Sequence, residues 1–297
     1  MDCNKSAQAV ESFTILLYNI HMKLTLIIAE KDDGISLKEF LSRQGYSTTQ
    51  IKRFKYSGEM TVNGHPTTVA QILKTGDTLI LATDERLTTP SFASNPAEIV
   101  FADQYLYVAA KPYGVAIHPD RAHKSETLGN MLATTFGNGF QLRIVTRLDK
   151  TTSGLVLGAL DEITAQKLNT LQHGHGIVKS YVALVEGLVE SDGEVTLPLT
   201  RMDGQNKTVV DISTGKQSHT VYRVHEKREN TTLLNVTPIT GRTHQIRAHL
   251  SAIGHPIVGD TLYGAQKDTR IMLHCERLTF IHPYTGEQVD LKLPADF

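Results

Sequence analysis

Residues 145–157 read VTRLDKTTSGLVL and form the densest group of polar residues in the chain. Arg147 and Asp149 stand two positions apart, a Thr/Ser/Gly turn follows, and an apolar strand begins at Leu155. A loop anchored by a buried strand is a common place for a catalytic carboxylate, because the rigid strand fixes its position. A surface Arg–Asp pair ahead of a hairpin turn would show the same pattern and would contribute at most about 1 kcal/mol. The residues of this segment alone favour the second interpretation.

The strand at Leu155 is one of several predicted between Glu98 and Phe297. Short apolar runs and alternation of apolar and polar residues predict strands at 99–101, 106–110, 155–160, 181–185, 209–212, 220–224 and 231–236. Helical spacing predicts helices at 162–172 and 243–253. The strands outnumber the helices and do not alternate with them. The sequence therefore predicts an α+β domain over 98–297, with a mixed, largely antiparallel β-sheet and flanking helices.

A small α/β domain is predicted at 24–82, followed by a polar linker at 83–97 that contains two prolines. Apolar residues between 35 and 41 have helical spacing, and Ser47 stands where it caps a second helix at 48–56. Asn-Gly at 63–64 predicts a tight turn between strands.

This small domain is also where positive charge collects. Its second predicted helix carries Lys52, Arg53 and Lys55 in one short stretch. Between Ile35 and Leu81 there are six basic and three acidic residues, in a chain whose net charge is −1. Local positive charge of this kind indicates a surface for a polyanion such as nucleic acid.

The overall composition is that of an ordinary globular protein, with 40% hydrophobic and 21% charged residues among 297. Its two cysteines, Cys3 and Cys275, are too few for a disulfide framework, which indicates a reducing cytoplasm. No run approaches the ~18 apolar residues of a membrane span. The apolar run at 13–20 lacks the features of an export signal, and Met22 is a second candidate start.

A second polar group, GRTHQIRAHL, begins at Gly241 and belongs to the helix predicted at 243–253. Thr243 or Thr240 would cap this helix, and His244 and Arg247 would lie three positions apart on one face. Arg242 would stand at the helix start, where backbone N–H groups attract anions. This arrangement suits a phosphate or a carboxylate that must stay ionised, and it equally suits a solvated helix face.

Other kinds of site have little support in the sequence. His244 and His249 stand five apart, so they do not share a helix face as a metal-binding pair would, and no metal is expected. Glycine-rich nucleotide loops are missing, as is a Gly-x-Ser-x-Gly elbow. Tyr181 alternates with Ala183 and Val185 on one strand face, a pattern typical of a core tyrosine.

Four segments, taken in order, resemble the motifs of the RluA-type family of RNA pseudouridine synthases. The segments are Lys111–Gly114 with Ile117–Pro119, Arg147–Leu155, Lys179–Gly187, and Gly241–Leu250 followed by Gly254–Asp260 and Tyr263-Gly264. His274 and His282-Pro283 fit the family's closing segment. The resemblance covers about Glu98 to Leu293. The stretch 24–82 is similar to the alpha-L RNA-binding motif of ribosomal proteins.

The resemblance implies an isomerase that needs no cofactor and converts uridine in RNA to pseudouridine. Asp149 is then the catalytic aspartate, and Arg247 is expected to stabilise its ionised form, as an arginine within about 4–6 Å does. Tyr181 is expected to position the base. Arg147 would help hold the flipped nucleotide, and Arg242 is second to Arg247 as the partner of Asp149.

The resemblance also indicates the RNA contacts and one departure from the family. Lys52, Arg53 and Lys55 would contact phosphates, which adds affinity without sequence information. Thr146 stands where the family usually has a histidine, so the exact placement of the loop differs from the usual one. Ribosomal RNA is the favoured substrate and transfer RNA the alternative, with a monomer as the default state.

Two other functions remain open at this point. A catalytically silent RNA-binding protein of the same fold is one, although Asp149, Tyr181 and Arg247 are all retained. A hydrolytic glycosidase is the other, and it would need a second carboxylate near Asp149, for which the sequence offers only Asp161, one strand away.

Overall fold

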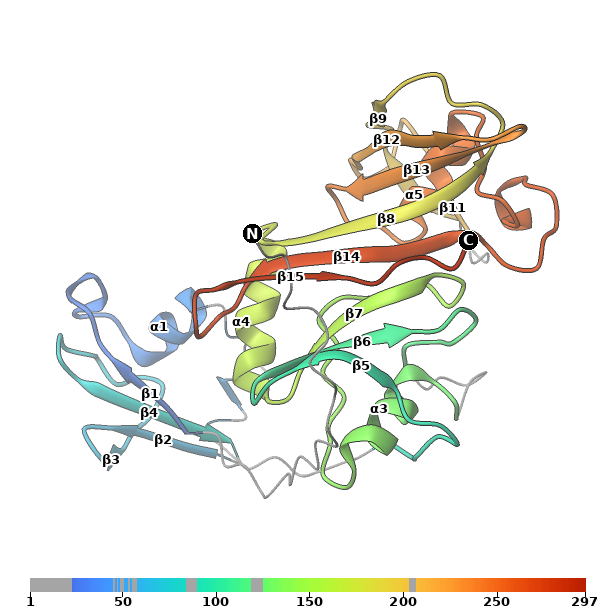
Figure 1. The fold of residues 1–297 in the computed structure, drawn as a ribbon. Coiled ribbons are helices and arrows are strands. Elements are labelled where there is room, and N and C mark those ends of the chain that lie inside the picture. The colour runs from blue at the N-terminus through green and yellow to red at the C-terminus, as the bar shows by residue number, and fades with distance from the viewer. Residues whose placement is uncertain are drawn as a thin grey trace, which may run out of the picture.

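The computed structural model describes residues 23–44, 46, 48, 51, 52, 54, 58–83, 90–118, 125–202 and 207–297. Within these ranges the chain forms a small N-terminal sheet and a large C-terminal sheet, which lie apart in Figure 1. A third, two-stranded sheet pairs β10 (Leu199–Arg201) with β11 (Thr208–Val210). No helix in the described ranges is long and apolar enough to cross a bilayer.

The N-terminal sheet has four antiparallel strands in the order β1-β4-β2-β3. They are β1 (Lys23–Ile27), β2 (Gly58–Val62), β3 (His65–Pro66) and β4 (Thr78–Thr83). The predicted turn at Asn63-Gly64 joins β2 to β3, and both residues have positive φ. Strand β1 is not among the strands predicted from the sequence; it lies at the edge of this sheet, and its residues 24–27 alternate between half-buried and exposed.

One face of this sheet carries α1 (Leu37–Arg43), preceded by a single 3-10 turn at Glu30–Asp32. Ser36 caps α1 by accepting a hydrogen bond from the Glu39 N–H at 3.2 Å, and the apolar side chains of the helix are buried. Of the predicted second helix, the described residues Thr48, Ile51, Lys52 and Phe54 are helical, and Lys52 is exposed. Arg53 and Lys55 lie outside the described residues.

The large sheet orders its strands β5-β6-β7-β14-β8-β13-β12-β9, and β15 pairs with β14 outside this path. The strands are β5 (Glu98–Ala102), β6 (Leu106–Lys111), β7 (Ser153–Ala159), β8 (Ile177–Glu186), β9 (Gly193–Val195), β12 (Thr220–Lys227), β13 (Thr231–Pro238), β14 (Leu273–Ile281) and β15 (Gln288–Lys292). Every pairing is antiparallel except that of β7 with β14. The predicted mixed, largely antiparallel sheet is therefore confirmed.

The parallel pairing of β7 with β14 is a narrow seam at the middle of the sheet. It consists of two residue pairs, Ser153 with His274 and Gly154 with Cys275. Gly154 has φ +118°, and a Cβ atom there would lie 2.3 Å from the carbonyl oxygen of Cys275, so only glycine allows this approach. The seam divides the sheet into a β5-β6-β7 half and a β14-β8-β13-β12-β9 half, to which β15 is added through β14 (Figure 1).

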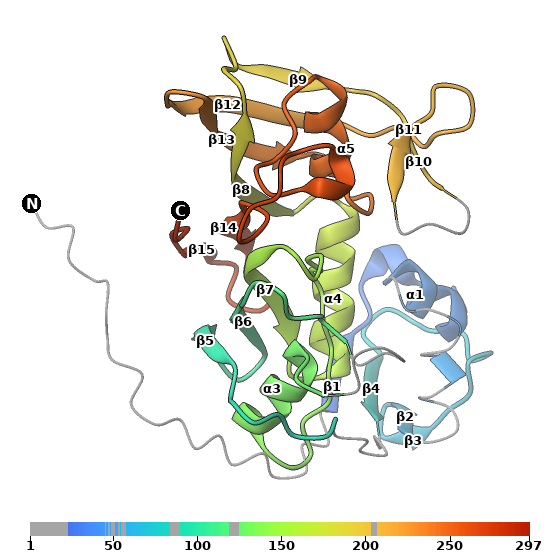
Figure 2. The same ribbon diagram turned by 90° about the vertical axis from the view of Figure 1, so that its right-hand side faces the viewer.

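Three helices accompany the large sheet. They are α3 (Leu128–Phe136), α4 (Glu162–His173) and α5 (Gln245–Ala252); a further 3-10 turn covers Thr261–Tyr263. In Figures 1 and 2, α3 lies with the β5-β6-β7 half, α5 with the other half, and α4 beside the small N-terminal domain. Asp161 caps α4 by accepting a hydrogen bond from the Thr164 N–H at 2.8 Å.

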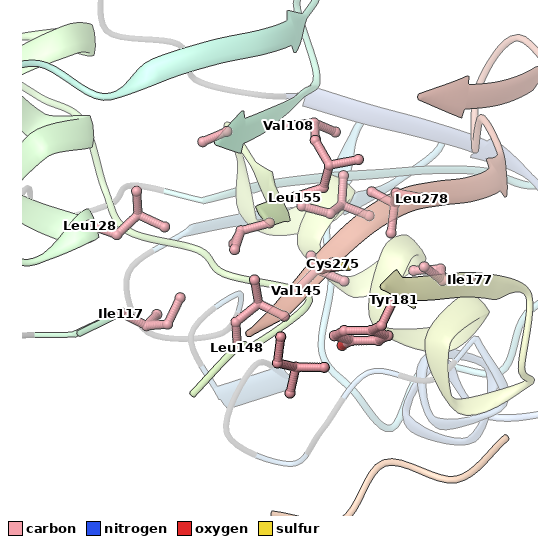
Figure 3. Close-up of a cluster of buried hydrophobic side chains, with 14 of the residues drawn as sticks. Val108, Ile117, Leu128, Val145, Leu148, Leu155, Ile177, Tyr181, Cys275 and Leu278 are labelled. Carbon is pink, nitrogen blue, oxygen red and sulfur yellow. The ribbon is translucent and has the colours of Figure 1, made fainter. Parts of the chain in front are cut away.

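Five helices and strands of this domain are not predicted from the sequence: α3, β9, β10, β14 and β15. For α3 a signal was present, because Thr127 and Asn130 form a reciprocal capping box at its start. The β14 residues His274, Glu276 and Arg277 interrupt the apolar pattern, which hid the central strand of the sheet. Its neighbours bury it nevertheless, and Cys275 and Leu278 are fully enclosed (Figure 3).

Thr83, the first residue of the region predicted as a linker, is the last residue of β4. The region is next described from residue 90 onward, and part of it is bound to α3. Ala93 donates its N–H to the Thr134 hydroxyl at 2.9 Å, and Ala97 donates its N–H to the Thr135 hydroxyl at 2.8 Å. This segment therefore packs on the C-terminal domain.

Candidate active site

The loop of Asp149 is held from both sides by hydrogen bonds. The Thr152 N–H donates to the Asp149 carbonyl at 3.0 Å, closing a turn, and the Gly114 N–H donates to the Lys150 carbonyl at 2.9 Å. On the other side, Thr146 is fully buried and its hydroxyl accepts the Leu157 N–H at 2.9 Å. Thr146 thus ties the start of the loop to β7.

Lys111 supports the same loop from beneath. Its buried ammonium donates to the carbonyls of Pro112 and Val115 at 2.8 Å and to that of Lys150 at 3.2 Å. Three acceptors match the three N–H donors of the charged form. Burial lowers the pKa of Lys111 to about 7, and the nearby Asp149 carboxylate opposes that shift. Lys111 is therefore a positioning residue that ties the loop after β6, at 112–115, to the loop of Asp149 and Lys150 before β7.

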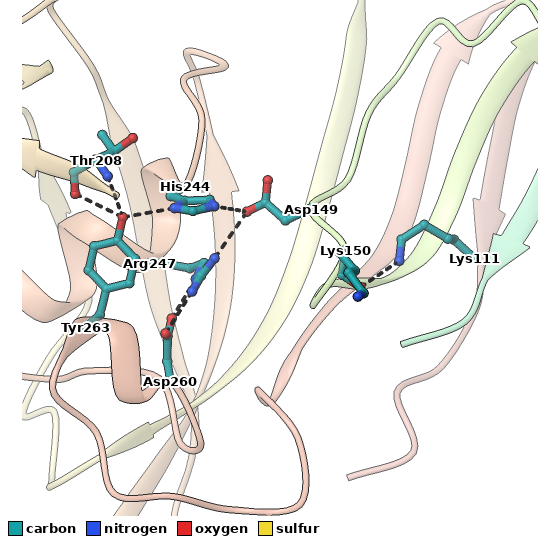
Figure 4. A network of polar contacts seen from close by, with 8 residues as sticks. All are labelled: Lys111, Asp149, Lys150, Thr208, His244, Arg247, Asp260 and Tyr263. Atoms are coloured by element: carbon teal, nitrogen blue, oxygen red, sulfur yellow. Dashed lines mark hydrogen bonds and ion pairs between the residues drawn. The ribbon is translucent and has the colours of Figure 1, made fainter. Parts of the chain in front are cut away.

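The start of α5 brings a second set of polar groups toward Asp149. The helix begins after His244, which has φ 53° and makes no side-chain cap bond, so the predicted cap at Thr243 or Thr240 is wrong. Instead, Gln245 joins the turn: its amide oxygen accepts bonds from the Thr240 hydroxyl at 2.7 Å and the Arg242 N–H at 3.0 Å. The left-handed backbone at His244 directs its side chain to the site together with that of Arg247 (Figure 4).

Arg247 is held in place by a buried carboxylate. Its Nε and Nη2 donate to the two oxygens of Asp260 at 2.6 and 2.8 Å, and the side chains are 5% and 0% exposed. Burial lowers the pKa of Arg247, but the bond and charge of Asp260 outweigh it, so the net direction is upward. Gly259 has φ +81° and no room for a Cβ atom, which fixes the turn that presents Asp260.

Asp149, from the loop before β7, faces His244 and Arg247 at the start of α5 (Figure 4). Its Oδ2 lies 3.8 Å from Arg247 Nη1 and 3.8 Å from His244 Nε2, and its side chain is 29% exposed. Among the described residues, the guanidinium of Arg247 is the arginine or lysine cation that lies within 4 Å of this carboxylate, and the Asp149 side chain keeps an open side. An ionised carboxylate in this position is able to act as a nucleophile or a base.

Tyr181 lies on β8 beneath this pocket, in the cluster of Figure 3 that also holds Cys275. Its side chain is buried, and burial raises its pKa well above the usual value of 10, with further contributions from Cys275 and Asp149. The hydroxyl therefore stays protonated at neutral pH and is unsuited to act as a base.

A single small pocket, with a cavity volume of about 100 Å³, collects five of the sequence-predicted residues. Its lining includes Arg147, Asp149, Tyr181, Arg242 and Arg247. Arg147 and Arg242 are exposed at its rim, and Arg242 Nη2 donates to the Gln217 carbonyl at 3.4 Å. Lys52, in the other domain, is not part of this lining.

Several groups of the site were missed in the sequence. Asp260 and Tyr263 belong to the segment that follows Gly241–Leu250, at 254–264. Their spacing in that segment does not show which side chains they contact. Lys179 also lines the pocket, and burial lowers its pKa. Lys179 and Tyr181 stand two positions apart on one strand, so their side chains share a face of the sheet. This spacing was the signal in the sequence that Lys179 lies near the site of Tyr181.

The site shows no arrangement for metal or paired-carboxylate chemistry in the part of the chain that the structure describes. No three His, Cys, Asp or Glu side chains come together there as ligands. Asp161 caps α4, and Asp260 is fully enclosed against Arg247, so neither is free to assist Asp149 as a second acid. In the described part of the site, Asp149 is therefore the carboxylate that is open to a substrate, and Arg247 lies beside it.

The chain is similar in sequence and structure to known proteins of one family. The sequence profile of the RNA pseudouridylate synthases matches residues 105–252. A Bacillus subtilis protein, the uncharacterized RNA pseudouridine synthase YjbO, is 32% identical over 269 residues, covering 88% of this chain and 95% of the relative. The ribosomal large subunit pseudouridine synthase D of Zymomonas mobilis is 36% identical over 223 residues, covering 68% of this chain and 70% of the relative.

A third relative and a solved structure agree. The dual-specificity RNA pseudouridine synthase RluA of Vibrio cholerae is 36% identical over 207 residues, covering 67% of this chain and 83% of the relative. The structure of human RNA pseudouridylate synthase domain containing 1 superposes with a TM-score of 0.59 at 28% identity, covering 72% of this chain and 87% of the human chain. The chain therefore belongs to the RluA-type family of RNA pseudouridine synthases, which are isomerases.

Proposed function

We propose that this chain is a cytoplasmic, monomeric enzyme that converts specific uridines of ribosomal RNA to pseudouridine, with Asp149 as the catalytic carboxylate. The observation that carries the proposal is the pocket in which Asp149 faces Arg247 and lies above Tyr181. The name of the Zymomonas relative and the positive small domain favour ribosomal RNA. The dual specificity named for the Vibrio relative makes transfer RNA the alternative.

The reaction is an isomerisation, so it needs no cofactor. The bond from uracil N1 to ribose C1′ breaks, the base turns, and C5 bonds to C1′ while the C5 proton leaves and N1 gains a proton. Asp149 would act as an anion, either by bonding covalently to C1′ or C6 or by removing a sugar proton to form a glycal. Arg247 supports all three routes, because its positive charge stabilises the Asp149 carboxylate from 3.8 Å. At that distance no hydrogen bond between them has to break before the carboxylate reacts.

The target uridine must leave its helix to reach a pocket of this size. Flipping a nucleotide costs a few kcal/mol. Arg147 and Arg242 stand exposed at the rim, where they would hold the flipped nucleotide and its neighbouring phosphates. Phosphate contacts of this kind position the RNA and leave its sequence unread.

Tyr181 is proposed to position the base with its ring. We expect Tyr181→Phe to retain clearly measurable turnover and Tyr181→Ala to lose at least about tenfold more, because only the alanine variant removes the ring and opens a cavity. Single-turnover rates with each variant measure this. If the phenylalanine variant were as inactive as the alanine variant, the hydroxyl itself would take part in a step.

The small domain is proposed to contact RNA phosphates through Lys52, Arg53 and Lys55. Replacing all three with alanine should weaken RNA binding most at low salt and flatten the dependence of affinity on salt, since fewer counterions are released on binding. Filter binding over a range of salt concentrations measures both quantities. Unchanged affinity and slope would show that these three side chains do not contact RNA. Lys38→Ala, on α1 of the same domain, is the control for a general loss of charge.

The proposed function is tested by the release of tritium from RNA that carries uridine tritiated at C5. Ribosomal and transfer RNA transcripts are assayed separately with the wild-type chain. Release from ribosomal RNA supports the proposal, and release from transfer RNA alone would move the substrate to the alternative. Tight binding without release from either pool would favour a silent RNA-binding protein of the same fold.

A further inference from the structure

The hydroxyl of Tyr263 is buried between Thr208 and His244, the histidine that faces Asp149. The Tyr263 hydroxyl accepts the Thr208 N–H at 3.0 Å and donates to the Thr208 carbonyl at 2.9 Å. Both residues are buried, so an unsatisfied Thr208 carbonyl would be costly. The single hydroxyl proton is therefore committed to Thr208.

His244 is the third partner of this hydroxyl, with its Nδ1 at 3.2 Å. Because the hydroxyl has no second proton to give, His244 must donate, and its Nδ1 carries the hydrogen. In the neutral ring Nε2 then holds a lone pair, and this atom faces Asp149 Oδ2 at 3.8 Å (Figure 4). An acceptor thus faces an acceptor across a gap that is too wide for a hydrogen bond.

The surroundings favour the neutral ring. Burial lowers the pKa of His244, and the charges of Arg247 and Arg201 act in the same direction, while Asp149 and Asp260 oppose them. Arg247 already supplies a positive charge at 3.8 Å from the same carboxylate oxygen. No hydrogen bond from a described residue reaches this nitrogen, so the Nε2 lone pair is open to a donor of the substrate.

We propose that His244 is a specificity residue whose Nε2 accepts a hydrogen bond from the 2′-hydroxyl of the target nucleotide. This rests on the proposed role of Asp149 at the sugar. A uridine offers two donors, the 2′-hydroxyl and the base N3–H. The 2′-oxygen is bonded to the carbon next to C1′, so it is the donor that lies beside the atoms where Asp149 acts.

The contact has two consequences for the reaction. It distinguishes a ribonucleotide from a deoxyribonucleotide at the reacting position, since the 2′-hydroxyl is what separates the two. It also fixes the ribose relative to Asp149, because one side chain holds O2′ while the other faces C1′. No proton needs to leave the 2′-hydroxyl for either effect.

Two substitutions separate the two ring nitrogens of His244. His244→Asn keeps a donor near the position of Nδ1, suits the left-handed backbone, and removes the group at Nε2. His244→Gln places an amide oxygen near the position of Nε2 and loses the bond to Tyr263. The two variants therefore separate the loss of the acceptor at Nε2 from the loss of the hydrogen bond between His244 and Tyr263.

The test uses a synthetic stem-loop around a uridine that the wild-type chain modifies, made with either uridine or 2′-deoxyuridine, tritiated at C5, at that one position. We expect the deoxy substitution to slow wild type about tenfold to a hundredfold more than it slows His244→Asn, with His244→Gln close to wild type. Equal ribose-to-deoxyribose rate ratios in all three proteins would overturn the proposal. Failure of the wild-type chain on every natural RNA would instead count against the proposed function.

A second measurement needs no activity. Long-range ¹H–¹⁵N NMR correlations of the His244 ring report which nitrogen is protonated in the free protein. At pH 7 we expect Nδ1 to carry the hydrogen and Nε2 to show the shift of an unprotonated nitrogen. A ring protonated at Nε2, or at both nitrogens, would overturn the proposal whatever the RNA substrate is.

Discussion

Asp149→Asn is expected to reduce tritium release by about 10²–10⁴-fold or more, while RNA affinity stays within a few-fold of wild type. The amide has nearly the shape of the carboxylate, so the loop bonds at Thr152 and Lys150, which use backbone atoms, remain in place. What disappears is the negative charge, and with it the capacity to bond to carbon or to accept a proton. Binding should persist because the side chains proposed to contact phosphates lie elsewhere.

The measurement is single-turnover tritium release together with filter binding of the same RNA. Glu229→Gln makes the same chemical change at an exposed position in the turn between β12 and β13, and it should leave both quantities unchanged. Substantial turnover by a pure Asp149→Asn protein would remove this residue from the mechanism. Equal losses of binding and turnover would mean that the substitution disturbs the RNA surface rather than the chemistry.

Arg247→Met is expected to have the second largest effect, and to act on stability as well as on turnover. It leaves the Asp260 carboxylate fully enclosed without its partner, a change that costs about 3–5 kcal/mol of unfolding free energy. Turnover should fall with it, because Asp149 loses the cation 3.8 Å away. Equilibrium urea unfolding and tritium release measure the two effects separately.

The chain contains a matched control for this pair. Arg277 and Asp290 form a similar two-bond contact between β14 and β15, but their side chains are 53% and 34% exposed. Arg277→Met should therefore cost at most about 1 kcal/mol. The double variant Arg247→Met/Asp260→Leu should recover much of the lost stability and none of the activity. An Arg247→Met protein as stable as Arg277→Met would show that burial does not set the strength of the pair.

The predicted fold agrees with the structure where the local pattern is strong. Strands β5, β6, β7 and β13 and helix α4 lie where apolar spacing and turn residues put them. The central strand β14 was missed, because its sequence LHCERLTFI mixes buried and charged residues. Its burial comes from strands and loops around it, and a local pattern does not record such neighbours.

The site shows the same division. Asp149, Tyr181 and Arg247 were singled out from motifs, and the structure brings all three to one pocket. Asp260 as the partner of Arg247 was not predicted. Asp260 is the carboxylate nearest to Arg247 in the sequence, but no helical or strand spacing links the two residues. The turn at Gly259 is what encloses Asp260 against the guanidinium.

By itself, therefore, the sequence determined the class of fold, the loop that carries Asp149 and the helix that carries Arg247, because these depend on turns and apolar spacing within short stretches. Only the tertiary structure decided what these groups face. The narrow β7–β14 seam sets Asp149 opposite α5, Asp260 orients Arg247, and Tyr263, which is bonded to Thr208, lies against His244. Each of these depends on the packing of segments distant in the chain, where geometry and burial select one partner among many that the sequence allows.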